Sequence, residues 1–317
     1  MTSLRNVLTA VVLLALLASY PTAAPKYDDW LEPVNLGAVV NSPFADRGPA
    51  ISKDGLSLYF SSVRPDDPAQ GASDSDIWVS QRDSLEAPWD SPINLGGIVN
   101  TEANESTPAL SRDEHCLFFN SNTSVGYGEN DIAFGETDIW ASYREHTHDD
   151  FGWETPVNLG DGVNSPFNDQ GAGYFENDEG GAPLLFFGSD RPDGPGLNDI
   201  YVSQLLPDYS SGPARLVAEL SSPADDLRPS VRFDGLEVFF FSNRPGSLGN
   251  DLWTATRETV FDFWSNIETL GTVVNSSAND THPYIAPDRR TLYFASTRAG
   301  GSGGQDLWVS TRTRQHP

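Results

Sequence analysis

The segment 89-WDSPINLGGIVN-100 recurs as WLEPVNLGAVVN at 30–41, as WETPVNLGDGVN at 153–164 and as WSNIETLGTVVN at 264–275. A degenerate copy, ARLVAEL, lies at 214–220. After every copy the same succession of short segments follows, rich in β-branched and aromatic residues. Repeats of this length and composition predict one small antiparallel sheet that is repeated around an axis.

Each repeat contains three further segments that are typical of β-strands, with turn residues such as Asp54-Gly55 between the first two. The first follows an acidic residue, the second ends in F-x-S-x-R in most units, and the third opens with Asp. No helical periodicity intervenes. First segments lie at 48–52, 107–111, 171–175, 228–232 and 282–286, second segments at 58–64, 117–123, 185–191, 238–244 and 292–298, and third segments begin at 76, 138, 199, 251 and 306.

Four strands in each of five units predict an all-β protein, a five-bladed β-propeller of antiparallel blades. The two chain ends strengthen this interpretation. The strand at 30–37 precedes every blade, whereas the last blade stops after its third strand near Arg312. The N-terminal strand must therefore complete the C-terminal blade, which removes both exposed sheet edges. We expect residues 25–317 to form this single domain.

The pattern S-x-D-G-x-x-L-Y-F-x-S-x-R followed by D-(I/L)-W-V-S resembles the bacterial WD40-like (Pro-Asp-forty) repeat of TolB-type periplasmic propellers. It is carried by residues 52–64 with 76–80, and again by 291–298 with 306–310. The resemblance covers nearly the whole chain after residue 24. It implies the propeller fold but no particular function. TolB-type proteins have six blades and a separate α/β domain, so their cellular role is not carried over.

The first 24 residues predict a cleaved secretory signal peptide, with Arg5, the apolar run VVLLALL at 11–17 and a small-residue end at 22–24. We therefore expect a periplasmic or secreted monomer without membrane insertion. Removing Arg5 leaves 18 of the 19 basic residues against 45 acidic ones, a net charge of −27. Such a surface excludes nucleic acid as a partner and favours cationic or neutral ligands. The single cysteine, Cys116, has no disulfide partner and is expected to be buried in a strand.

An acidic residue stands just before each first strand, and ring closure would bring all of them to one mouth of the channel. Two positions further on, the same strand face carries a second ring of residues. We predict that the acids, with Arg228 and His282, bind a ligand. The alternative is that each acid only accepts hydrogen bonds from its own turn. The acids are Asp46, Glu105, Asp169, Asp226 and Asp280, and the second ring is Gly48, Thr107, Gly171, Arg228 and His282.

Two other residue types recur in the repeats. The Asp that opens each third strand is predicted to pair with the Arg that ends the second strand, as a structural link between these strands. The recurrent tryptophans are predicted to pack between blades. The Asp residues are Asp76, Asp138, Asp199, Asp251 and Asp306; the Arg residues are Arg64, Arg191, Arg244 and Arg298, with Thr123 in the second unit; the tryptophans are Trp78, Trp140, Trp253 and Trp308.

Ca²⁺ is the one cofactor that the sequence suggests. In the loops 65–76 and 124–138, Asp74 with Asp76, or Glu129 with Asp131, offer oxygen ligands of the kind that Ca²⁺ prefers. Neither loop has a known calcium-binding spacing, so solvated turns are the alternative. The run HTHDD at 146–150 resembles part of a zinc site but lacks a further ligand at a fixed spacing.

These features favour a non-enzymatic binding propeller of the cell envelope, which recognises a protein, peptide or carbohydrate at its acidic channel mouth, directly or through a divalent cation. The alternative is a glycoside hydrolase, because five-bladed propellers also resemble arabinanase- and xylosidase-type enzymes. In that case Glu105 would be the acid and Asp46 or Asp169 the base. A third possibility is a structural scaffold whose axial acids hold Ca²⁺.

Overall fold

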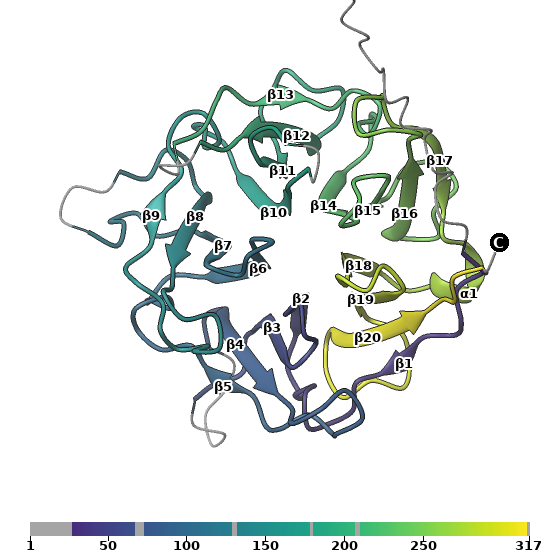
Figure 1. Ribbon diagram of the computed structural model, residues 1–317, viewed down its shortest axis with the longest axis horizontal. Helices are drawn as coiled ribbons and strands as arrows, with labels where there is room; N and C mark the ends of the chain where they lie inside the picture. Colours follow the sequence, from purple (N-terminus) through teal and green to yellow (C-terminus); the bar gives the residue numbers. More distant parts are fainter. Residues whose placement is uncertain (1–26, 67–72, 129–131, 178–179, 207–209, 316–317) are drawn as a thin grey trace, which may run out of the picture.

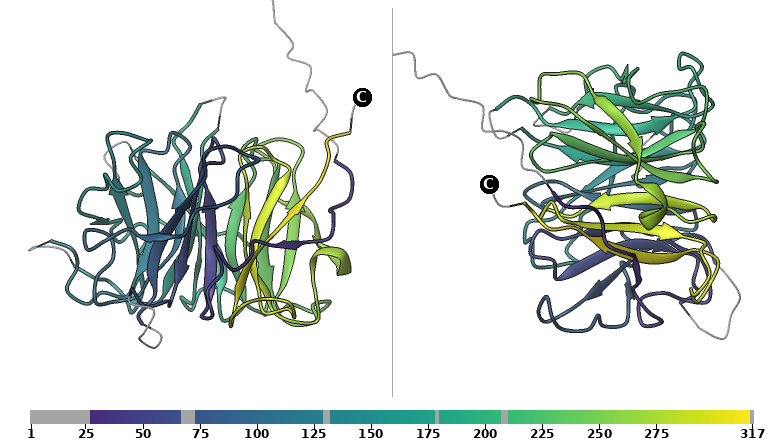
Figure 2. Two further views of the ribbon diagram at one scale, coloured as in Figure 1. Left: turned by 90° about the horizontal axis from the view of Figure 1, so that it is seen from below. Right: turned by 90° about the vertical axis from the view of Figure 1, so that its right-hand side faces the viewer.

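The computed structural model describes residues 27–66, 73–128, 132–177, 180–206 and 210–315, so the predicted signal peptide lies outside the described residues. Five four-stranded antiparallel sheets stand around a common axis (Figure 1). The predicted five-bladed β-propeller is therefore confirmed. Figure 2 shows the strands running between the two faces of the ring. No helix in the described ranges has the length and apolar character needed to cross a bilayer.

The four strands of each blade follow one another from the axis to the rim. The first strands are β2 (Asp46–Ile51), β6 (Glu105–Leu110), β10 (Asp169–Phe175), β14 (Asp226–Val231) and β18 (Asp280–Ile285). The second strands are β3 (Ser57–Ser62), β7 (Cys116–Ser121), β11 (Leu184–Ser189), β15 (Glu237–Ser242) and β19 (Thr291–Ser296). The third strands are β4 (Asp76–Gln81), β8 (Asp138–Tyr143), β12 (Asp199–Gln204), β16 (Asp251–Thr256) and β20 (Asp306–Thr311).

The fourth strands are shorter than the repeated segment suggests. They are β5 (Ile93–Asn94), β9 (Val157–Asn158), β13 (Arg215–Leu216), β17 (Ser265–Thr269) and β1 (Val34–Asn35), and the helix α1 (Gly271–Val274) follows β17. In three of them a proline, Pro33, Pro92 or Pro156, stands directly before the strand. Because proline has no N–H to donate to the ladder, pairing there begins only after it.

The register of the strands distinguishes the two faces of the ring. Asp46 lies opposite Ser62, and Ser62 lies opposite Asp76. The starts of first and third strands therefore share one face, called here the carboxylate face. The turns that join first to second strands lie on the opposite face, called here the hairpin face.

The core consists of five clusters of buried apolar side chains, each between neighbouring blades. Between the first two blades, for example, Tyr59 and Val79 pack with Phe119 and Trp140. The four recurrent tryptophans are at most 8% exposed, so their predicted place in the core is confirmed. Cys116 is buried in β7 and forms no disulfide within the described residues, also as predicted.

The asparagine that ends the repeated segment links that segment to the third strand. The Asn100 side chain accepts a hydrogen bond from the N–H of Ile77 and donates one to its carbonyl oxygen, both at 2.9 Å. In the degenerate copy Ser221 contacts the same two groups of Ile200, at 3.1 and 3.4 Å. Asparagine is therefore repeated because its amide satisfies a donor and an acceptor together. The other pairs are Asn41 with Leu307, Asn164 with Ile139, and Asn275 with Leu252.

The ring is closed by the N-terminal strand, as predicted. Val34 pairs with Val309 and Asn35 with Trp308, so β1, purple in Figure 1, completes the blade of β20, yellow. Beyond the ladder, the Trp30 ring packs against Phe239 of the preceding blade, with ring centres 5.8 Å apart. The two ends of the described chain therefore hold each other and the neighbouring blade.

We predict that Asn41→Ala lowers the free energy of unfolding by about 2 kcal/mol, because it leaves the buried N–H of Leu307 without a partner and removes one of two hydrogen bonds to its carbonyl oxygen, which also accepts the N–H of Leu36. Urea denaturation followed by tryptophan fluorescence measures the loss. Val39→Ala, at an exposed position two residues away, is the matched control and should change little. An equal effect of both substitutions would show that Asn41 does not secure the closure.

Candidate functional site

Each first-strand acid lies at the first residue of its strand and is buried inside its blade. The side chains of Asp46, Glu105, Asp169, Asp226 and Asp280 are all 0% exposed. On a strand, side chains stand perpendicular to the sheet and therefore point toward a neighbouring blade, whereas the backbone edge of the innermost strand faces the axis. The structure thus brings these acids to one level of the ring without presenting them to the channel.

A repeated set of hydrogen bonds holds each of four acids. Asp46 accepts bonds from the N–H and hydroxyl of Ser42, at 2.6 and 2.9 Å, and from Arg64 at 2.6 Å. The same guanidinium donates to the carbonyl oxygen of Val40 and lies over the Phe60 ring. We call this set the carboxylate box: the acid, the serine four residues before it, and the arginine at the end of the second strand. The other three boxes contain Asp169 with Arg191, Asp226 with Arg244, and Asp280 with Arg298.

The predicted pairing of Arg64 with Asp76, and of its counterparts with the other third-strand acids, is therefore wrong. Arg64 pairs with Asp46, on the first strand of the same blade. Both acids lie beside Ser62 in the register, so spacing along the chain does not distinguish them. Their hydrogen bonds do, because Asp46 accepts from Arg64 whereas Asp76 accepts from Asn94 of the fourth strand.

The second blade builds its box without a cation. Thr123 stands in the arginine position, and the hydroxyl of Tyr127 contacts the same two acceptors as the guanidinium does, to only one of which its single proton can be donated at a time. It lies 3.0 Å from Glu105 and 3.0 Å from the carbonyl oxygen of Val99. Glu105 also accepts bonds from Thr101 and Ser121. The acid in this box is a glutamate, whose side chain is one methylene group longer than the aspartates of the other boxes and reaches the hydroxyl of Tyr127.

Glu105, Asp46 and Asp169, the residues of the glycoside hydrolase alternative, are thus enclosed in three different blades. A general acid and base for glycoside hydrolysis must both reach one substrate. The predicted ligand-binding role of the five acids likewise stays a prediction, because their bonds within the described residues serve the blades.

The third-strand acids have a separate role on the same face. Asn94, Asn158 and Asn35 of the fourth strands donate to Asp76, Asp138 and Asp306, at 2.9, 2.8 and 2.9 Å. In the other two blades Leu216 and Thr269 occupy the asparagine position. There one carboxylate oxygen of Asp199, and one of Asp251, is buried without a partner. Burial raises the pKa of both.

On the axis itself, the second predicted ring is brought together and closes the channel. Each of its residues adopts a positive φ, between 53° and 71°, at a bulge in the first strand. Arg228 extends across the axis and donates to the carbonyl oxygens of Thr107, Pro108 and Ala172 in two other blades. A methyl group on Gly48 would lie 3.3 Å from its Nη2, and one on Gly171 only 3.0 Å from its Cδ. The two glycines therefore make room for the arginine.

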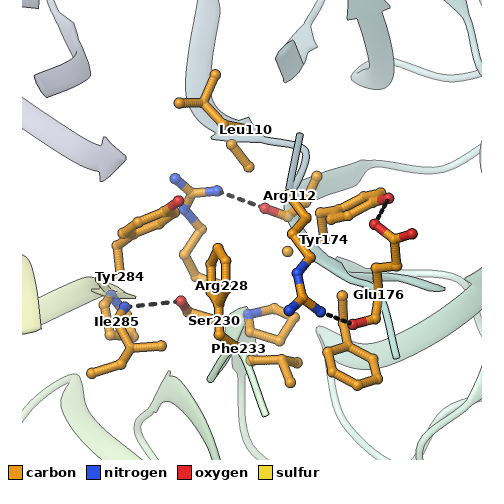
Figure 3. A pocket seen from close by; sticks show the side chains of 16 residues that line it. Leu110, Arg112, Tyr174, Glu176, Arg228, Ser230, Phe233, Tyr284 and Ile285 are labelled. Atoms are coloured by element: carbon orange, nitrogen blue, oxygen red, sulfur yellow. Dashed lines mark hydrogen bonds between the residues drawn. The ribbon is translucent and has the colours of Figure 1, made fainter. Parts of the chain in front are cut away.

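A recess opens from this plug toward the hairpin face, on the side opposite the predicted mouth. Its walls carry Tyr174, Phe233 and Tyr284 from three blades (Figure 3). Arg112 donates to the carbonyl oxygen of Glu176 at 3.0 Å and lies over the Phe233 ring at 5.4 Å. The Tyr174 hydroxyl donates to the Glu176 carboxylate at 3.2 Å. The recess measures only about 30 Å³.

An open basin of about 470 Å³ borders the recess and shares Arg112 and Glu176 with it. Lys53, Asp113 and Asn177 complete the polar wall of the basin. We call the recess and the basin together the axial depression. The volume of the basin falls within the range of small-molecule sites, and the aromatic rings lie in the recess that borders it.

Sequence reasoning missed the axial depression, although one signal was present. The residue five positions after each bulge differs in every blade, in contrast to the repeated box residues. These residues are Lys53, Arg112, Glu176, Phe233 and Pro287, and four of them line the axial depression.

Among the described residues, no group of three or more His, Cys, Asp or Glu side chains is placed to hold a metal ion. Asp150 of the HTHDD run accepts bonds from Arg144 at 2.7 Å and from Tyr59 at 2.5 Å, so it links two blades. His146 and His148 are exposed. Glu129 and Asp131 lie outside the described residues, and the Ca²⁺ prediction remains untested.

Solved structures with a similar fold include the Bacillus subtilis arabinanase Arb43A, which has 12% identity and a TM-score of 0.54 over 87% of this chain and 96% of that one. The endo-arabinase of Bacteroides thetaiotaomicron has 14% identity and a TM-score of 0.55, over 92% and 98%. A putative TolB from Agrobacterium tumefaciens reaches 14% and 0.47, over 92% and 100%, too distant to support the TolB-type resemblance. No family model and no curated protein matches the sequence. The comparisons therefore establish the fold alone.

We predict that Asp169→Asn lowers the free energy of unfolding by about 3 kcal/mol, because it leaves the mostly buried charge of Arg191 without a counter-charge. Chemical denaturation at neutral pH measures the loss. Glu105→Gln is the matched control, since its box contains tyrosine instead of arginine, and its loss should be clearly smaller. Equal losses would mean that the ion pair is not what the box depends on.

We also predict that Asp76→Asn stabilises the fold at about pH 8 but not at about pH 4. Burial, with smaller contributions from Glu105 and other acids, raises the pKa of Asp76 to about 6. The unfolded value is about 3.9, so this carboxyl favours the folded state below that pH and loses the advantage as the pH rises through 6. Asparagine does not ionise. The test is to record melting curves of the wild type and of Asp76→Asn across this pH range, with Asp83→Asn at an exposed position as the control. A stabilisation by Asp76→Asn that does not change with pH would contradict the prediction.

Proposed function

We propose that this chain is an exported carbohydrate-binding propeller whose ligand site is the axial depression of the hairpin face. The observation that carries the proposal is the gathering of three aromatic rings, Tyr174, Phe233 and Tyr284, around one recess beside charged groups. An aromatic face packs against the C–H face of a sugar ring, while hydroxyl groups bind convergent polar side chains. Export rests on the predicted signal peptide.

Divergence between the repeats supports this location. Residues that recur in every blade serve the sheets, the boxes and the closure. The hairpin-face position that differs in all five blades supplies Lys53, Arg112, Glu176 and Phe233 to one depression. A ligand that contacts several blades at once meets different side chains from each, which is what specific recognition requires.

A glycoside hydrolase is the second candidate, favoured by the fold that this chain shares with arabinanases. The enclosed acids Asp46, Glu105 and Asp169 do not suit that role. The carboxylates that line the axial depression do: Glu176 borders both the recess and the basin, and Asp113 borders the basin. An inverting enzyme would need such a pair to lie roughly 6.5–9.5 Å apart across the scissile bond.

The test is a glycan array followed by calorimetry on the best ligand. Phe233→Ala should weaken binding about tenfold or more, because it removes one apolar wall of the recess. Phe261→Ala is the matched control, since this phenylalanine is 80% exposed and does not line the depression. Binding that is unchanged in Phe233→Ala would place the ligand elsewhere, and no glycan binding at all would overturn the proposal.

Incubation with arabinan, xylan and aryl glycosides separates the two candidates. Sugar release that is lost in Glu176→Gln while binding persists would identify a hydrolase. Binding without release would identify a binding protein.

A further inference from the structure

Arg228 is the one buried arginine in the described part of the chain that contacts no carboxylate. The other three, Arg144, Arg232 and Arg312, are each paired with an acid. Arg228 is 4% exposed and donates only to carbonyl oxygens, at 3.1 to 3.3 Å. Its Nε is buried without any partner. A full positive charge thus lies on the axis of a strongly acidic protein without a counter-charge.

Burial lowers the pKa of Arg228 to about 9, so the guanidinium remains charged at neutral pH. A buried ion without a counter-ion is costly, and neutral carbonyl oxygens replace only part of its hydration. The backbone adds to this cost, because Arg228 adopts a φ of 60°, a conformation that suits glycine. Something must offset both costs, or the position would be expected to carry glycine, as Gly48 and Gly171 do in two other blades.

The surroundings of Arg228 are positive as well. Arg47 and half-buried His282 approach the same axis from two other blades. Besides burial, the charges of Arg228 and Arg47 hold the pKa of His282 well below its ordinary value, which indicates that the three groups share one field. No salt bridge between Arg47 and a described acid relieves this field. The nearest acids of the inner strands are enclosed in their boxes with their own arginines.

The space beside Arg228 suits a single ion. The recess as a whole measures about 30 Å³, and Arg228, Ser230 and Tyr284 are among the residues that line it; the Tyr284 ring lies beside the arginine side chain in Figure 3. The Ser230 hydroxyl accepts the N–H of Ile285, which leaves its own proton free to be donated.

We propose that the propeller axis holds a small monovalent anion of halide size, with Arg228 as its principal ligand. The anion supplies the missing counter-charge and accepts the free Nε–H. A water molecule would satisfy that donor but would leave the charge in place. The ion joins the first strands around the plug, and its binding does not require a bound carbohydrate, although Tyr284 lines both the recess of the ion and the proposed carbohydrate site.

The experiment uses the mature protein, dialysed into sodium gluconate and then titrated with sodium chloride or bromide at constant ionic strength. The expected result is a saturable rise of the melting temperature by a few degrees, because the anion binds the folded state alone. Arg228→Gly should abolish the rise while the fold persists, since glycine suits the positive φ of this position. Thr107→Gly is the matched control: it makes the same kind of change in the same ring, at a φ of 57°, and should keep the rise.

A wild-type melting temperature that does not respond to halide, or an equal response in Arg228→Gly, would overturn the proposal. Crystals grown with bromide provide a measurement that does not depend on folding of the variant. An anomalous peak beside the Nε of Arg228 supports the site, and the absence of a peak there at saturating bromide refutes it.

Discussion

Each blade of this ring must bury both faces of its sheet against its two neighbours, and the rest of the structure depends on that constraint. It sends the side chains of the innermost strands into the spaces between blades and leaves their backbone edges to face the axis. An acid at the start of such a strand is therefore taken out of water. Once buried, Asp46 requires hydrogen-bond donors, which Ser42 and Arg64 provide, and Arg64 also supplies a counter-charge. The carboxylate boxes are thus a consequence of blade packing.

The second blade shows what a box must accomplish. Tyr127 replaces the guanidinium, and the acid becomes Glu105, yet the Tyr127 hydroxyl still lies 3.0 Å from both the carbonyl oxygen of Val99 and the acid, and donates its one proton to either of them. The aromatic surroundings are also kept: the Tyr127 ring packs against Trp140 at 4.9 Å, where Arg64 lies over Trp78 at 5.4 Å. The box thus requires a flat donor group that fills the space between two rings. The positive charge is one way of meeting that requirement.

Much of the fold could be predicted from the sequence, because closure is a matter of counting. One strand precedes the first blade and belongs to none of the four strands that follow it there, while the last blade lacks a fourth strand. Only one arrangement satisfies both counts, and β1 pairs with β20 accordingly. The partner of Arg64 could not be predicted in this way, since Asp46 and Asp76 are equally near in register to Ser62, and only the structure shows that Arg64 bonds to Asp46 while Asn94 bonds to Asp76. The axial depression does not follow from the repeat, because it is formed by residues that differ between blades. Arg112, Glu176 and Phe233 occupy equivalent positions and share no chemistry.

The axis shows why departures from the repeat carry the most information. Five first strands meet there, and the space between them accommodates one large side chain. With Arg228 extended across the axis, Gly48 and Gly171 leave no room for a side chain. A methyl group on Gly48 would lie 3.0 Å from the Cα of Thr107 and 3.3 Å from the Nη2 of Arg228, and one on Gly171 would lie 3.0 Å from the Cδ of Arg228. If all five blades carried arginine at this position, the side chains would clash, and five glycines would leave the axis unfilled. A ring built from nearly identical blades must therefore become asymmetric at its centre, and the residue that fills the centre places its charge on the axis, where, besides burial, it lowers the pKa of His282 in the next blade.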